Sequence, residues 1–215
     1  MKKAYPNLKL QINTDGWRLF LKRNKDKRFD AYKQSILKKH SYKCHFCGFQ
    51  SKHLQQIINL NSNYLDMRAS NLAPACPLCT QCLFLNLTGK GTMTSGTIIY
   101  LPEISQNELN AMMHVVLCAI FNNTPAMNQA HAIYNSLKAR EKVVDEQIIQ
   151  GFSNPARLSQ SIIDSSIKNK SSFEDKLLMD LRLLPSQQSF DENLNIYSKS
   201  ALESSYETIE QIGGG

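Results

Sequence analysis

Hydrophobic residues are periodic in some parts of the 215-residue chain and scattered in others. Residues 8–12 alternate apolar and polar side chains, which predicts a short strand. From Lys27 to His40 apolar residues recur at helical spacing, with lysines on the other face. Residues 97–101, TIIYL, have the pattern of a strand, which Pro102 ends. This part of the chain therefore predicts both strand and helix.

The segment after Pro102 predicts helices with clear boundaries. The capping box Ser105–Glu108 opens the first helix, and Asn122–Asn123 end it. Thr124–Pro125 supply a cap and a first-turn proline for a second helix, which Gly151 stops. Asn154–Pro155 start a third, shorter helix.

The composition changes after residue 163. Residues 164–172 are rich in Ser and Lys, as in a linker, and 173–184 are strongly apolar up to Pro185. Residues 186–212 are polar, which predicts a loosely ordered tail.

Positive charge is concentrated near the N-terminus. The net charge is +7, but residues 1–43 hold thirteen Lys and Arg against three Asp, while the remainder holds twelve basic against fifteen acidic residues. Basic residues interleaved with aromatic ones are typical of a nucleic-acid contact. The same lysines are also compatible with a solvated helix face, or with a face toward anionic lipid or an acidic partner segment. The side chains concerned are Trp17, Phe20, Lys22, Arg23, Lys25, Lys27, Arg28, Phe29, Lys38 and Lys39.

The sequence carries no sign of export. The N-terminal lysines precede no apolar stretch typical of a signal peptide, and no run of about 18 apolar residues occurs. We therefore expect a cytoplasmic protein whose cysteines are metal ligands or buried thiols rather than disulfides.

Four cysteines have the spacing of a zinc site. Cys44 and Cys47 form one CxxC pair, and Cys76 and Cys79 form another after 28 intervening residues. Zinc accepts four thiolates in a tetrahedron, each sulfur about 2.3 Å from the metal. Such a site has no open position for water or substrate, so the pattern predicts a structural Zn²⁺. Gly48, after the first pair, suits a turn that needs positive φ.

Three other side chains near these cysteines are candidate ligands for the same site. Cys82 forms a CxxC pair of its own with Cys79 and is the alternative fourth ligand. Pro77 fits inside a knuckle turn and favours Cys79. His45 lies between the first two cysteines, where its ring should point away from the metal, and four thiolates leave no place for His53.

Residues 44–82 resemble the treble-clef module of the HNH endonuclease family. In that family a CxxC pair precedes a strand with an Asp-His pair, and Ser-Asn-Leu precedes a second CxxC pair. Both cysteine pairs and Ser70–Leu72 match, but the general-base His falls on Gln56, the adjacent Asp on Gln55, and a third position near Thr80. Glutamine cannot take a proton from water at neutral pH and binds Mg²⁺ poorly. The resemblance therefore implies a treble-clef fold without nuclease activity.

Residues 1–208 further resemble the IcmJ (DotN) family of the Dot/Icm type IV secretion system. The similarity lies in the basic lead-in 28–43, in CHFCGFQSKHLQQIINLN and in ACPLCTQCLFLNLTGKGTMTSGTIIYLPE. It implies a cytoplasmic, non-enzymatic zinc subunit of the coupling complex at the inner membrane. Such a subunit would bind the C-terminal tail of the coupling ATPase DotL, beside DotM and the IcmS–IcmW adaptor, and would help to build the platform that recruits effectors. Composition and spacing are compatible with this role but do not point to it.

These features together predict an α+β protein in four parts. They are a basic lead-in (1–43), an HNH-like treble-clef zinc module (44–101), a helical region (102–185) and a polar tail (186–215). The leading hypothesis for function is a structural module that binds a protein partner. The alternative is a nucleic-acid-binding protein or HNH-type nuclease.

Overall fold

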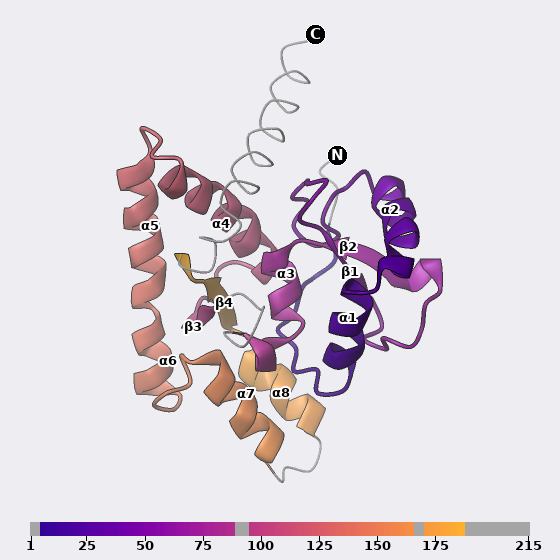
Figure 1. Cartoon of the computed structure of the whole chain (residues 1–215). Helices are drawn as coiled ribbons and strands as arrows, with labels where there is room; N and C mark the ends of the chain where they lie inside the picture. The colour runs from indigo at the N-terminus through magenta and orange to yellow at the C-terminus, as the bar shows by residue number, and fades with distance from the viewer. Residues whose placement is uncertain (1–4, 89–94, 166–169, 188–215) are drawn as a thin grey trace.

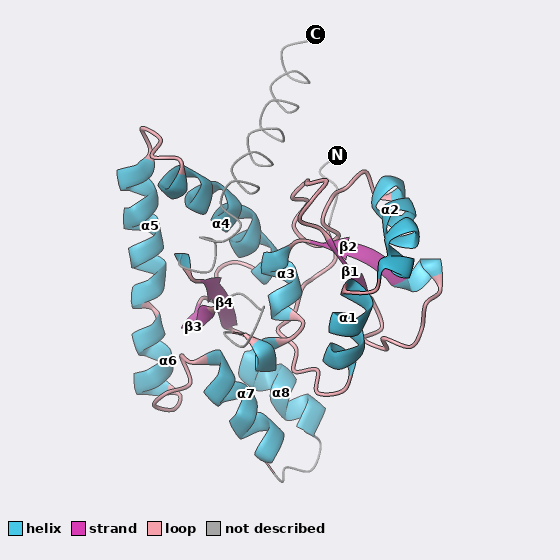
Figure 2. Cartoon of the chain, in the orientation of Figure 1, coloured by secondary structure: helices cyan, strands magenta, loops and turns pink. Residues whose placement is uncertain are grey.

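The computed structural model describes residues 5–88, 95–165 and 170–187 (Figure 1). Its helices and short strands are interleaved along the chain, which confirms the α+β class (Figure 2). The helices are α1 (Gly16–Asn24), α2 (Asp30–Lys39), α3 (Pro77–Cys82), α4 (Gln106–Phe121), α5 (Met127–Ala139), α6 (Glu141–Gln147), α7 (Pro155–Asp164) and α8 (Lys170–Leu178). The 3₁₀ turns are η1 (Lys27–Phe29), η2 (Ala69–Asn71) and η3 (Leu85–Leu87), and the strands are β1 (Gln56–Asn59), β2 (Leu72–Ala75), β3 (Gly96–Tyr100) and β4 (Leu181–Pro185). Residues 166–169 of the predicted linker and 188–215 of the predicted tail lie outside the described residues.

The first strand pair, β1–β2, is antiparallel and is covered by α2. Gln56 lies opposite Ala75, and Asn59 lies opposite Leu72. A small core joins the helix to this pair and consists of Phe29, Ile36, Leu37, Ile57 and Leu72. The helix predicted from Lys27 to His40 is thus present as η1 followed by α2.

The N-terminal segment differs from its prediction. Residues 8–12 form no strand, although Leu8 and Leu10 are buried as the alternation requires. Gln11 donates to the Cys82 carbonyl (2.8 Å) and accepts from the Leu85 amide (2.9 Å), whereas the amides of Leu8 and Ile12 donate to side chains. Backbone bonds at one residue do not make a strand ladder. Helix α1 follows and buries Phe20. The sequence pattern did not predict this helix.

The second strand pair, β3–β4, is also antiparallel and lies among α4–α8 (Figure 1). It confirms the strand expected at 97–101, with Gly96 opposite Pro185 and Tyr100 opposite Leu181. The apolar segment 173–184 supplies the end of α8 and most of β4. Apolar side chains of β3, β4 and α4 form the centre of this side, namely Ile98, Ile99, Leu109, Met113, Leu183 and Leu184.

The predicted helix boundaries are mostly confirmed. The capping box is present, since Ser105 Oγ accepts the Glu108 amide and Glu108 Oε2 accepts the Ser105 amide (2.8 Å). Asn154 caps α7, because its Oδ1 accepts the amides of Ala156 (3.0 Å) and Arg157 (3.1 Å).

The second predicted helix is wrong in its start and its continuity. It begins at Met127 rather than at Pro125, because the Thr124 hydroxyl donates to the Ala119 carbonyl of the preceding helix (3.3 Å). It also divides into α5 and α6 at Arg140, whose guanidinium binds Glu103 (2.8 Å).

Candidate metal centre

The first cysteine pair lies on a tight hairpin. Lys43 and Gln50 pair across it, and the Cys44 amide donates to the Phe49 carbonyl (2.8 Å). Gly48 has φ +77°, as the sequence predicted, and a Cβ at this position would collide with the Tyr5 ring. The positive φ is what favours glycine in this turn, because the exposed Tyr5 ring can move aside.

The second pair lies where β2 passes into α3. Cys76 is the N-cap residue of α3, Pro77 occupies its first turn, and Cys79 follows within that turn. The amide of His45 donates to the carbonyl of Pro74 in β2 (2.8 Å), which fixes the hairpin against the strand. Two local turns thus present two sulfurs each to the same space.

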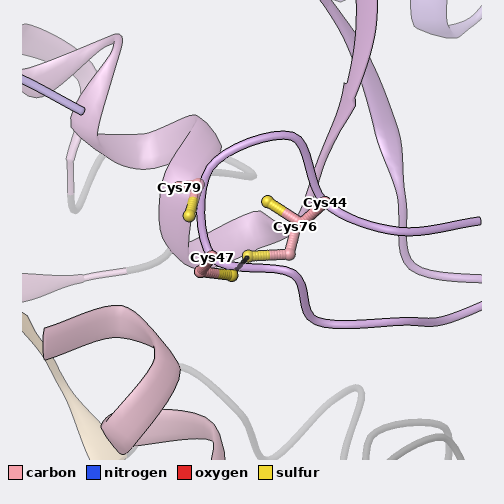
Figure 3. A group of neighbouring side chains, drawn as sticks. All are labelled: Cys44, Cys47, Cys76 and Cys79. Carbon is pink, nitrogen blue, oxygen red and sulfur yellow. Dashed lines mark hydrogen bonds between the residues drawn. The ribbon is translucent and has the colours of Figure 1, made fainter. Parts of the chain in front are cut away.

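The four predicted sulfur atoms come together. Those of Cys44, Cys47, Cys76 and Cys79 all lie within 4.8 Å of one another, and Cys47 Sγ is 3.6 Å from Cys76 Sγ. Figure 3 shows all four facing one small space, with Cys79 projecting from its helix. A tetrahedral ion with bonds of about 2.3 Å separates its sulfurs by about 3.8 Å. These four cysteines can therefore hold a metal ion.

Burial sets the electrostatics of the cluster. It raises the pKa of the Cys76 and Cys79 thiols well above the ordinary value, whereas hydrogen bonding from Cys44 lowers the pKa of Cys47. Four clustered sulfurs, on three buried cysteines and one partly buried one, cannot all ionise at neutral pH without a compensating charge. A divalent cation supplies that charge and is bound by the thiolate forms.

Cys82 does not belong to the cluster. Its thiol donates to the Leu78 carbonyl (3.2 Å), and burial raises its pKa to about 12. His45 and His53 are likewise outside the group of possible ligands among the described residues. The structure thus places Cys79, not Cys82, with the other three sulfurs.

Helix α4 contributes polar contacts that the sequence did not reveal. Asn110 Nδ2 lies 3.3 Å from Cys79 Sγ, and His114 Nε2 lies 3.3 Å from Cys76 Sγ. The His114 ring stacks on Phe49 with centroids 3.8 Å apart and an interplanar angle of 7°. A signal was present, because Gln106, Asn110 and His114 recur every four residues on an otherwise apolar helix face.

Of the three residues that the HNH resemblance singles out, Gln55 makes structural contacts. Gln55 is buried, and its Nε2 donates to the carbonyls of Tyr42 (3.1 Å) and Phe49 (2.7 Å). Gln56 begins β1, and Thr80 is buried in α3. Gln55 therefore holds the first knuckle closed.

The basic lead-in is only partly available to a nucleic acid. Phe20 and Phe29 are buried and cannot stack on bases. Arg23 is directed inward, where its guanidinium donates to Asn59 Oδ1 (2.6 Å) and to the Ile57 carbonyl. The remaining cations of the predicted contact are exposed, namely Lys22, Lys25, Lys27, Arg28, Lys38 and Lys39.

None of the helices in the described part of the chain has both the length and the apolar character needed to cross a membrane.

Comparison with known proteins gives a family. No protein-family profile matches the chain. The chain is, however, 43% identical over 196 residues to the type 4 apparatus protein DotN of Legionella pneumophila subsp. pneumophila, covering 91% of each protein. Identity at this level over nearly the whole length establishes common descent, and the chain belongs to the DotN family of type IV apparatus proteins.

Proposed function

We propose that the chain binds one structural Zn²⁺ through Cys44, Cys47, Cys76 and Cys79. The observation that carries the proposal is the group of four sulfurs within 4.8 Å of one another. An all-thiolate donor set is typical of zinc, and its full shell leaves no place for a substrate. The ion would join the two knuckles, and its binding free energy would stabilise the folded state.

The knuckles, β1–β2 and α3 are compatible with a degenerate HNH-like treble clef. Gln55 and Gln56 stand in place of the carboxylate and the general base, and Thr80 lies at the third position. None of these side chains can activate water at neutral pH. We infer that the protein is not an enzyme.

The family relationship supports a role as a cytoplasmic subunit of a type IV secretion apparatus. We propose that it binds the C-terminal tail of the coupling ATPase DotL at the inner membrane. DotM and the IcmS–IcmW adaptor would belong to the same complex, which would recruit effector proteins.

Affinity purification from the native host, combined with metal analysis, tests both proposals. We expect one zinc per chain and co-purification of the coupling ATPase, stable to nuclease and to moderate salt. A chain without metal would refute the zinc site, and a chain with zinc but without the ATPase would refute the assembly role.

The exposed lysines of residues 22–39 favour nucleic-acid binding as the second candidate. A mobility-shift assay across a salt series separates the two. A steep loss of affinity with salt, together with Mg²⁺-dependent nicking, would support the nuclease hypothesis.

A further inference from the structure

Helix α4 carries three buried polar side chains, of which Asn110 and His114 contact sulfurs of the metal centre. Gln106, Asn110 and His114 are each at most 7% exposed. A four-residue spacing places them along one side of the helix. Burying a polar group is unfavourable unless it forms hydrogen bonds, so the partners of these groups indicate their role.

The backbone of β4 fixes the orientation of two side-chain amides. The Leu183 amide donates to Gln106 Oε1 (2.9 Å), and the Leu183 carbonyl accepts from Gln106 Nε2 (3.0 Å). Because a backbone N–H only donates and a backbone C=O only accepts, Gln106 has a single possible orientation. Its Nε2 also donates to Asn110 Oδ1 (2.9 Å). Asn110 must therefore present its Nδ2, a donor, to the sulfur of Cys79.

His114 makes the equivalent contact to Cys76, the other cysteine of the second pair. Its Nε2 is 3.3 Å from Cys76 Sγ, and the parallel Phe49 ring holds the imidazole plane. A metal-bound thiolate carries no proton, so the nitrogen must donate in this contact.

We propose that Asn110 and His114 form an outer hydrogen-bonding shell of the metal centre, which holds the Cys79 and Cys76 thiolates in place and slows metal loss. The proposal rests on the zinc site proposed above. Two N–H donors offset part of the excess negative charge that four thiolates place around a dication. Asn110 also connects the site, through Gln106, to strand β4 of the helical side.

The test uses the full-length protein and two substitutions that remove a donor while keeping the shape of the side chain. Asn110→Leu removes the amide, and His114→Phe keeps a ring to stack on Phe49. Ser159→Ala is the matched control, because Ser159 is equally buried but bonds to the Pro155 carbonyl in α7. The readouts are zinc content, the rate of zinc transfer to a chromogenic chelator, and the sulfur-to-metal charge-transfer band of the Co²⁺-substituted protein.

We expect both variants to bind one zinc and to release it about 10–100-fold faster than the unaltered protein, because losing an outer-shell partner typically lowers metal affinity by that factor. The cobalt band should move to longer wavelength, because a thiolate without an N–H···S bond is a better electron donor. Unchanged release and an unchanged band would overturn the proposal, as would equal acceleration in Ser159→Ala. Absence of zinc from the unaltered protein would instead overturn the zinc site itself.

Discussion

The two strand pairs are stabilised in different ways. Around β3–β4 the stabilising contacts are mostly apolar, from side chains such as Ile99, Leu109 and Leu183 that are fully buried, and buried Gln106 adds hydrogen bonds to the Leu183 backbone. Around β1–β2 they include many bonds from buried polar side chains to backbone carbonyls. Asn59, for example, donates to the carbonyls of Asn63 (2.8 Å) and Asp66 (2.7 Å).

The difference follows from the chain segments involved. The β3–β4 side consists of helices whose backbone groups are paired internally. The β1–β2 side contains the long irregular stretches 40–55 and 60–68, whose backbone groups need other partners. Amide side chains such as Gln55 provide those partners, and the zinc ion that we propose for the cysteine cluster would add a cross-link. Loss of metal should therefore affect the β1–β2 side far more than an equally severe change in the apolar core.

The largest effect is expected from Cys76→Ser. Metal binding is worth about 10 kcal/mol of apparent energy at a structural zinc site, more than most domains have in reserve. We expect protein without zinc that is insoluble or unfolded in the knuckles, measured by soluble yield, metal analysis and hydrogen exchange. Cys118→Ser is the control, since Cys118 lies outside the cluster. A folded, soluble Cys76→Ser protein would contradict the proposed role of the metal.

The next largest effect is expected in the apolar core around β3–β4. Leu109 is fully buried in α4, and Leu109→Ala should lower the free energy of unfolding by about 2–5 kcal/mol through lost burial and a cavity. Chemical denaturation measures this loss. Zinc stoichiometry should remain one per chain, and a variant that loses zinc would show that the two sides are not independent.

Asn59→Leu probes the polar bonds of the β1–β2 side. The change leaves two loop carbonyls and the Arg23 guanidinium without the Asn59 partner, which should cost about 1–3 kcal/mol. Hydrogen exchange should increase in residues 59–71 and stay constant in α5. Asn128→Leu, on the exposed face of α5, is the matched control. Uniform destabilisation of the whole chain would contradict a local role for Asn59.

Much of this division was accessible from the sequence. The CxxC spacing predicted that the four cysteines lie together, and the caps at Ser105 and Asn154 predicted two helix starts correctly. Both kinds of signal are local in the sequence. The α1 helix was not predicted, because it is only nine residues long and begins at Gly16, a residue type that disfavours helices.

The polar contacts of the candidate site were only partly accessible from the sequence. The four-residue spacing of Gln106, Asn110 and His114 marks a polar line on α4. Their role follows only from the tertiary packing of α4 on the knuckles, because Asn110 and His114 meet sulfurs that are 31 and 38 residues away in sequence. The role of Asn59 was likewise not predictable, because its partners lie in an irregular loop that has no periodic sequence pattern. The ligand assignment itself and the division into four parts stay predictions.

The smallest effect concerns the capping box of α4, where the two sides meet. Ser105→Ala removes one side-chain acceptor from the Glu108 amide and should cost about 1 kcal/mol, measured by denaturation. Because Glu108 returns a bond to the Ser105 amide, the two side chains act as one unit. The double variant with Glu108→Ala should therefore cost less than the sum of the two single variants. Additive losses would mean that the two bonds are independent. Faster zinc release in Ser105→Ala would mean that fraying of the first turn of α4 reaches Gln106. The N-terminal end of α4 would then be part of the support for the metal.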